Sequence, residues 1–201
     1  EIQNYTENQF ETTEIDTFIQ QAEQRIYNSV QLPALRRNVT GSTTINNKYL
    51  SCPSDWLATF SLAVIDGSGN YNYLLNKDVN FIRAAYPAPT DTGLPEYYAV
   101  FDSNSFILGP TPSASYAVEL HYFYYPESIV TAGTTWLGNN FDSTLLYGSL
   151  LEAYTYMKGE EDVLKNYQSR YDMAMALLKQ LGDGKDRRDA YRSGQVRMDV
   201  V

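Results

Sequence analysis

The chain has 201 residues, of which 43% are hydrophobic and 19% are charged. At this length one domain, or one domain with an insertion, buries roughly 70% of the surface of the unfolded chain, so a full hydrophobic core is expected. The 24 acidic and 15 basic side chains give a formal charge of -9. Proteins that hold nucleic acids by their phosphates carry the opposite balance, so sequence-independent nucleic-acid binding is not expected.

The chain contains one cysteine, Cys52, and one histidine, His121. A structural zinc site needs about four Cys or His ligands, so neither a metal nor another cofactor is predicted. A single cysteine forms no disulfide within the chain. No apolar run approaches the ~18 residues needed to cross a bilayer. We therefore expect a soluble protein, made in a reducing cytoplasm, with no membrane partner.

The first predicted element is an amphipathic helix over residues 13–31. Its apolar side chains recur at spacings of three and four: Ile15, Phe18, Ile19, Ala22, Ile26 and Val30. Residues 13–16 are similar to a capping box, which predicts the start of the helix. Pro33 lacks an N–H group and is expected to end it.

Over residues 38–126 the apolar period changes to two, which is typical of strands. The alternating residues before the turn at 66–70 are Trp56, Ala58, Phe60, Leu62 and Val64, and those after it are Tyr71, Tyr73 and Leu75. This pattern predicts a β-hairpin. Further runs over residues 79–85, 97–101, 106–108 and 116–125 are separated by prolines. We expect about six antiparallel strands in a small sandwich or barrel.

Two more helices are predicted over residues 142–158 and 160–181. Asp142 is expected as the N-cap of the first helix, and Gly159 as the left-handed residue that follows it. The two apolar stripes consist of Leu146, Leu150, Ala153 and Met157, and of Leu164, Tyr167, Tyr171, Ala174, Leu178 and Leu181. The second stripe covers about two and a half heptads, which favours packing within the subunit over a coiled coil. The two segments therefore predict a helical hairpin.

Residues 183–201 are expected to form an extended C-terminal arm that follows a single domain, residues 1–182. Residues 185–201 contain five basic and three acidic side chains, a charge of +2 on a body of -11. Seventeen extended residues reach about 55 Å, enough to lie along another subunit. The last six residues alternate like a strand that adds to a sheet edge, with a frayed terminus as the alternative. The predicted fold class is α+β: an N-terminal helix, an inserted antiparallel β-sandwich or barrel, a C-terminal helical hairpin and the arm.

The sequence contains no motif that predicts catalysis. The segment 67–72 lacks the third glycine of a dinucleotide-binding loop, and no Walker lysine follows a glycine-rich turn. His121 and Glu119 share a strand face, but without a nucleophile we expect a half-exposed structural pair. Glu160 and Glu161 are explained by their place at a helix start. We predict no catalytic residues and no enzyme.

The 18 tyrosines allow two interpretations. Tyrosine and tryptophan stack on sugars, so a β-sandwich carbohydrate-binding or adhesion module that uses Trp56 and Trp136 is an alternative function. Tyrosine also builds cores and protein interfaces, and the positions on helix stripes and alternating strands favour this second use. A glycoside hydrolase is the least favoured hypothesis, because it requires two carboxylates facing each other across a cleft.

A family resemblance is carried by residues 145–153 (LLYGSLLEA), 158–161 (KGEE) and 167–171 (YQSRY). These segments resemble the helical hairpin of the head-to-tail adaptor (connector) proteins of tailed bacteriophages, in particular those of short-tailed phages. Residues 94–100, leading into 106–112, are similar to the β segment of that family. In the order of its elements the resemblance covers residues 10–182.

The resemblance implies a structural virion protein at the head–tail junction. It implies a ring of identical subunits, twelve in the family, that binds below the portal protein, extends the DNA channel and docks the tail tube or nozzle protein. Double-stranded DNA passes through such a lumen without specific binding, which agrees with the acidic balance. The implied portal contacts of the arm are Arg187, Arg188, Tyr191, Arg192, Val196, Met198 and Val200.

A ring of identical subunits needs a heterologous interface, in which one face of each subunit meets a different face of the next. Amphipathic helices supply such faces. We assign the subunit interface to helix residues Leu146, Leu150, Tyr167, Tyr171 and Leu178.

Overall fold

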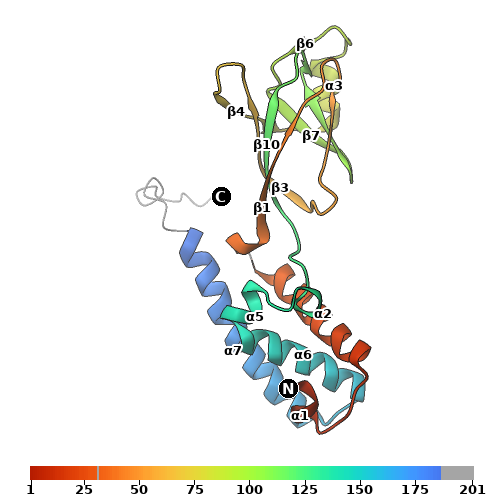
Figure 1. Cartoon of the computed structure of the whole chain (residues 1–201), viewed down its shortest axis with the longest axis vertical. Helices are drawn as coiled ribbons and strands as arrows, with labels where there is room; N and C mark the ends of the chain where they lie inside the picture. Colours follow the sequence, from red (N-terminus) through yellow and green to blue (C-terminus); the bar gives the residue numbers. More distant parts are fainter. Residues whose placement is uncertain (31, 187–201) are drawn as a thin grey trace, which may run out of the picture. The chain divides into compact units, whose positions relative to one another are not determined.

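The computed structural model describes residues 1–30 and 32–186, and the chain divides into two compact units. The helical unit consists of residues 1–35 together with the chain from Tyr125 on, and the β-rich unit is Arg36–Tyr124. Helices from both parts of the sequence thus form one unit, and the segment between them forms the other (Figure 1). The predicted α+β class is confirmed.

The helical unit is built on three long helices. The helices of this unit are α1 (Ile2–Thr6), α2 (Thr12–Ser29), the 3-10 helix η1 (Pro33–Leu35), α4 (Ile129–Ala132), α5 (Trp136–Asn140), α6 (Asp142–Met157) and α7 (Glu161–Asp186). The predicted helices 13–31, 142–158 and 160–181 correspond to α2, α6 and α7. Helix α7 extends five residues beyond its predicted end.

The start of α2 differs from the prediction in its capping residues. Glu11 is the N-cap, and the Glu14 carboxylate accepts the Glu11 N–H at 2.9 Å, so the capping box is formed two residues earlier than residues 13–16 predict. The helix ends at Ser29, four residues before Pro33, and the proline instead begins η1. Pro33 is therefore not the residue that ends α2.

Both predicted terminal residues of α6 are wrong. Phe141 is the N-cap, and Asp142 is the first helical residue, with its carboxylate accepting the Ser143 N–H at 2.7 Å. At the other end Lys158, with φ 55°, is the left-handed residue. Gly159 is needed for space, because a Cβ there would lie 2.5 Å from Cδ1 of Tyr154.

The β-rich unit contains ten short strands within the described residues, where about six were predicted. They are β1 (Arg36–Ser42), β2 (Tyr49–Ser51), β3 (Ala58–Ile65), β4 (Tyr71–Tyr73), β5 (Leu75–Asn76), β6 (Thr92–Gly93), β7 (Tyr97–Asp102), β8 (Ser105–Gly109), β9 (Thr111–Pro112) and β10 (Ala117–Phe123). Two sheets have four strands each, in the orders β1-β10-β3-β4 and β2-β8-β7-β5, and β6 pairs with β9. The four-stranded sheets are antiparallel except for the β5–β7 pair, and β6–β9 is also parallel. The strands do not close into a barrel.

The core of the β-rich unit is shared by the two four-stranded sheets. The first sheet contributes Leu62, Val64, Val118, Leu120 and Tyr122, and the second contributes Tyr98, Phe106 and Leu108. Alternation explains this core: in β10 each second residue is buried and those between are half-exposed or exposed. The hairpin predicted on either side of residues 66–70 is confirmed as the antiparallel pair β3–β4.

The prediction of a strand over residues 79–85 is wrong, because the segment forms helix α3 (Val79–Ala85). Its apolar residues Val79, Ile82 and Tyr86 are spaced three and four apart and cover Ala99 and Ile107 of β7 and β8. The Asp78 carboxylate accepts the Asn80 N–H at 2.7 Å and begins the helix.

In the helical unit, α6 lies between α2 and α7 (Figure 1). The core around α2 and α6 contains Phe18, Leu150 and Ala153, and Ile2 and Phe10 close it from the N-terminal segment. At Gly148 both neighbouring helices come close: a Cβ there would lie 3.2 Å from Cβ of Ala22 and 3.2 Å from Cε2 of Tyr171. The absence of a side chain at this position permits the three-helix packing.

Candidate functional site

The five side chains assigned to a subunit interface pack within the helical unit. Leu150 and Leu178 have no exposed surface, and Tyr171 is 6% exposed. Leu146 and Tyr167 are half-buried against the core around α2 and α6. The assignment of these residues to contacts between copies stays a prediction.

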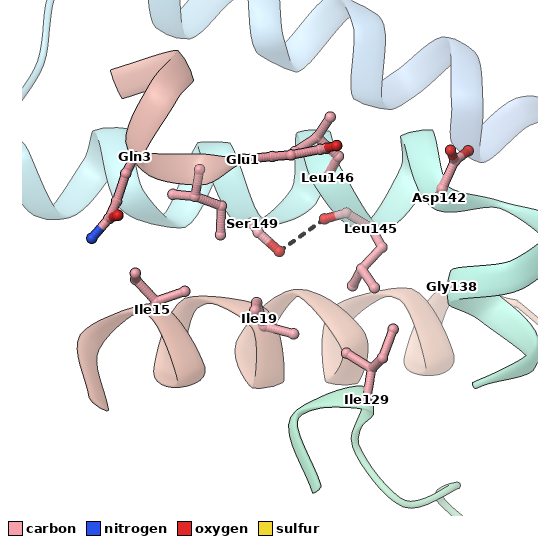
Figure 2. Close-up of a pocket in the computed structure, with 11 residues that line it drawn as sticks. Glu1, Gln3, Ile15, Ile19, Ile129, Gly138, Asp142, Leu145, Leu146 and Ser149 are labelled. Atoms are coloured by element: carbon pink, nitrogen blue, oxygen red, sulfur yellow. Dashed lines mark hydrogen bonds between the residues drawn. The ribbon is translucent and has the colours of Figure 1, made fainter. Parts of the chain in front are cut away.

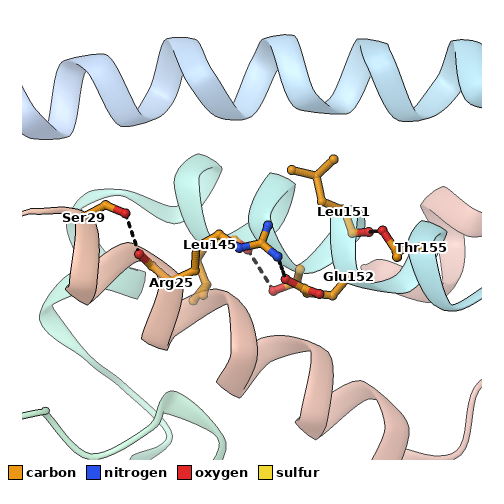
Figure 3. Close-up of polar contacts among 7 residues, drawn as sticks. Arg25, Ser29, Leu145, Leu151, Glu152 and Thr155 are labelled. Atoms are coloured by element: carbon orange, nitrogen blue, oxygen red, sulfur yellow. Dashed lines mark hydrogen bonds and ion pairs between the residues drawn. The ribbon is translucent and has the colours of Figure 1, made fainter.

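Polar contacts also join α2 to α6. The Arg25 guanidinium forms an ion pair with Glu152 across the two helices (Figure 3). The hydroxyls of Ser29 and Thr155 donate to carbonyls four residues earlier in their own helices, at 2.8 and 2.7 Å. The ion pair therefore adds a charged contact to the apolar packing of α2 on α6.

A groove of about 440 Å³ lies between α2 and α6, and we call it the α2/α6 groove. Tyr156 is 59% exposed on its wall, and its ring centroid lies 5.4 Å from that of the buried Phe18. The Tyr156 hydroxyl donates to Glu14 at 2.6 Å. This hydrogen bond lowers the pKa of Glu14 and raises the pKa of Tyr156. The groove thus combines an exposed aromatic ring with a carboxylate held in its charged form.

The side of α7 that faces away from α6 carries two large exposed apolar residues. Met173 is 67% exposed and Leu177 is 63% exposed, while Tyr171 and Leu178 on the other side are buried. Sequence reasoning missed Met173 and Leu177 because it followed only the main stripe. The sequence does indicate them, because both are apolar residues of the helix that lie outside the stripe from Leu164 to Leu181.

An apolar cavity of about 310 Å³ lies among α1, α2 and α6 (Figure 2). Ile15, Ile19 and Leu146 line it together with Ser149, whose hydroxyl donates to the Leu145 carbonyl at 2.8 Å. The Ser149 hydroxyl therefore already has a hydrogen-bond partner within its own helix. The isoleucine and leucine side chains of the lining are suited to apolar contacts.

His121 and Glu119 lie on one face of β10, as the alternation predicts, and are half-exposed. The His121 ring contacts Phe60, with centroids 4.9 Å apart. Glu119 accepts hydrogen bonds from Asn38 at 2.8 Å and from the Tyr71 hydroxyl at 3.1 Å. Each of the two is thus engaged in cross-strand contacts of the sheet.

Neither tryptophan of the carbohydrate-binding hypothesis presents a free ring. Trp56 is half-buried, packs edge-on against Phe106 at 5.4 Å between centroids and donates to the Thr59 hydroxyl at 3.1 Å. Trp136 is half-buried beside Phe141, at 5.7 Å between centroids. Both rings have packing roles in their own units.

Cys52 is half-buried, and burial together with the charge of Asp102 raises the pKa of its thiol to about 11. Such a thiol is protonated near neutral pH and reacts slowly. Among residues 1–30 and 32–186, no three His, Cys, Asp or Glu side chains form a group that could hold a metal ion. Glu161, one of the paired carboxylates at the start of α7, forms an ion pair with Lys165 at 2.7 Å.

The predicted portal-binding residues lie outside the described residues. They are Arg187, Arg188, Tyr191, Arg192, Val196, Met198 and Val200. Their assignment stays a prediction from the sequence and the resemblance.

The chain is an α+β protein whose helical unit exposes the large side chains of Tyr156, Met173 and Leu177. The model of the SU10 adaptor protein family matches residues 1–199, nearly the whole chain. The chain therefore belongs to the SU10 adaptor protein family, as the resemblance to phage head-to-tail adaptors predicts. The name of this family indicates phage adaptor proteins, a structural and non-enzymatic class located in the virion. A search among curated proteins finds no significant match.

None of the helices within residues 1–30 and 32–186 combines the length and the apolar character needed to cross a membrane.

Proposed function

We propose that this chain forms a ring of identical subunits that binds below the phage portal, extends the DNA channel and docks the tail. The observation that carries the proposal is the family match over residues 1–199. Twelve copies are expected from the resemblance to head-to-tail adaptors. The exposed apolar residues of the helical unit support assembly, because large apolar side chains that remain in water favour contact with another protein.

The C-terminal arm is proposed to bind the portal. Residues 185–201 carry a charge of +2, and arginine binds carboxylates through two parallel hydrogen bonds. Alternating Val196, Met198 and Val200 suit the addition of a strand to a sheet edge of the portal. The partners of this chain are therefore its own copies, the portal protein and a tail tube or nozzle protein.

Size-exclusion chromatography with light scattering tests the assembly. The chain is mixed with the purified portal protein of the same phage, and we expect a complex whose mass corresponds to a portal with a ring of about twelve added copies. A chain that elutes alone as a monomer in the presence of the portal contradicts the proposed function.

Deletion of residues 185–201 tests the arm separately. We expect the deletion to weaken portal binding at least tenfold, measured by biolayer interferometry on immobilised portal. The double variant Arg187→Ala, Arg188→Ala is expected to show part of this loss. Its matched control is Lys77→Ala, Arg83→Ala, which removes the same charge from exposed positions of the β-rich unit. Unchanged affinity after the deletion contradicts arm binding but leaves the adaptor function standing.

A further inference from the structure

Among the described residues of the helical unit, the three long helices leave two different surfaces exposed. Helix α6 lies between α2 and α7 (Figure 3). One surface therefore belongs to the outer side of α7, and the other is the α2/α6 groove. A head-to-tail interface between identical subunits requires two different patches that fit each other. Whether the two surfaces fit each other depends on their side chains and charges.

The outer side of α7 is a ridge of two large apolar side chains. Met173 and Leu177 are four residues apart, so they stand one above the other on the helix, and each has more than 60% of its surface exposed. The neighbouring Ser169 and Ala176 are small and exposed. Small neighbours let another helix or groove come close to the ridge.

The α2/α6 groove has the volume to take the ridge and contains two aromatic rings. Its volume of about 440 Å³ is large enough for two such side chains, and it presents the exposed ring of Tyr156 above Phe18. Methionine sulfur makes favourable contacts with aromatic rings. The groove thus has room for the ridge, and Phe18 and Tyr156 offer it an apolar contact. The other side chains that line the groove are polar: Thr13, Glu14, Thr17, Gln21, Glu152 and Thr155.

The part of α7 that surrounds the ridge has a charge opposite to that of α2. Residues 11–29, which form α2 and its N-cap, contain four acidic and one basic side chain, a formal charge of -3. The whole of α7 has a formal charge of -1, but residues 165–180, which surround the ridge, contain three basic and one acidic side chain, and of the basic ones Lys165 is paired with Glu161. Pairing the ridge with α2 is therefore favoured electrostatically over pairing it with the same part of another α7.

We propose that the Met173–Leu177 ridge of one copy docks in the α2/α6 groove of a second copy of this chain. The inference rests on the proposed ring assembly and names the two surfaces that form its interface. Because ridge and groove are different patches, each copy can use both at once, and the contact extends from copy to copy until the ring closes.

Cysteine cross-linking between separately labelled copies tests the proposal. Cys52 is first replaced by Ser, and single cysteines are then introduced as Gln21→Cys, which lines the groove, or Met173→Cys on the ridge. The matched control is Ser103→Cys, an exposed position of the β-rich unit. The variants are oxidised alone and in pairs, with and without the portal protein, and the products are resolved by non-reducing electrophoresis.

We expect a dimer from the mixture of Gln21→Cys and Met173→Cys, and a ladder of higher species from the double variant. Each single variant alone is expected to give no more dimer than Ser103→Cys. Strong dimer formation by Met173→Cys alone overturns the proposal in favour of symmetric α7 pairing. Assembly that light scattering detects without any groove-to-ridge cross-link overturns the interface but not the ring, and a chain that stays monomeric with the portal overturns both.

A second variant checks the energetics without new disulfides. Met173→Glu places a carboxylate opposite the acidic groove, and its native side chain is largely exposed, so folding is expected to be retained. We expect association to weaken about tenfold or more, because a buried unpaired charge opposes a docked interface. Ser103→Glu is the control for the added charge. Equal association of the two variants contradicts the proposed interface.

Discussion

Gly148 lies where α6 is approached from both sides, so its replacement tests the packing of three helices at one position. A Cβ at this residue would stand 3.2 Å from atoms of both Ala22 and Tyr171, and a larger side chain has no space. We expect Gly148→Val to lower the free energy of unfolding by about 1–3 kcal/mol through overpacking. Gln20→Val, at an exposed position of α2, is the control and is expected to change it by less than about 0.5 kcal/mol. Urea denaturation measures both, and equal effects would contradict the packing.

Asp55 in the β-rich unit predicts a pH dependence of stability. Burial raises the pKa of this carboxyl, but hydrogen bonds from Tyr122 and Arg37, both 2.8 Å, outweigh it, and the net pKa is lowered. A lowered pKa in the folded state stabilises the fold above the ordinary value near 4, and this contribution is lost as the pH falls through the folded pKa. The loss of stability in Asp55→Asn is therefore expected to be largest near neutral pH and to shrink below about pH 4.

Denaturation of wild type and Asp55→Asn in a pH series provides the measurement. Tyr122→Phe removes one of the two hydrogen bonds, so its stability should also approach that of the wild type on acidification. A difference between wild type and Asp55→Asn that is the same at pH 3 and pH 7 would show that the contact does not influence the ionisation of this carboxyl.

Helix α3 shows at the scale of one element why the apolar period alone misled the sequence prediction. Residues 79–85 were predicted as a strand because they form a short apolar run within a β-rich segment, and a short run fits both structures. The decisive features are the N-cap at Asp78 and the spacing of Val79, Ile82 and Tyr86. The long helices were predictable because their periodicity persists over four or more turns.

The N-cap of α3 provides an element-scale prediction. Asp78→Ala leaves the Asn80 N–H without its side-chain acceptor, and we expect a loss of about 1 kcal/mol in the free energy of unfolding. Asp78→Asn keeps an acceptor oxygen and serves as the matched control, with a smaller effect. Thermal denaturation followed by circular dichroism compares the three proteins. If Asp78→Asn lowers the free energy of unfolding as much as Asp78→Ala does, the effect belongs to the charge of Asp78 and not to the hydrogen bond.

The candidate surfaces were only partly predictable from the sequence. The stripes of α6 and α7 identify Leu150 and Leu178 as apolar contact residues, but a stripe does not tell whether its partner lies in the same chain, and both are fully buried there. The α2/α6 groove joins Phe18 and Tyr156, which are far apart in sequence, so only the packing of the two helices brings them together. The family match, in contrast, follows from residue order and needs no structure.

At the scale of the whole molecule, the formal charge of -9 predicts weak interaction with DNA. Phosphates are repelled at short range, and salt screens the effect beyond ~8 Å at physiological strength. Fluorescence anisotropy with a labelled duplex at physiological salt is expected to give a Kd weaker than about 10⁻⁴ M, at the weak limit of non-specific binding. The variant without residues 185–201 should bind no more tightly. Saturable micromolar binding with a steep salt dependence would contradict a passive channel.

The two-part sequence of the helical unit has a consequence for synthesis on the ribosome. Helix α2 is translated more than 100 residues before α6, its main packing partner, whereas the β-rich unit is one uninterrupted segment. At translation rates of about 5–20 residues per second, several seconds or more pass between the synthesis of α2 and that of α6, and during this time the apolar stripe of α2 lacks its partner helix. The strands can therefore reach their native pairing in the nascent protein before α2 packs on α6. The helical unit is the first to begin synthesis, but the β-rich unit is the first to complete its fold.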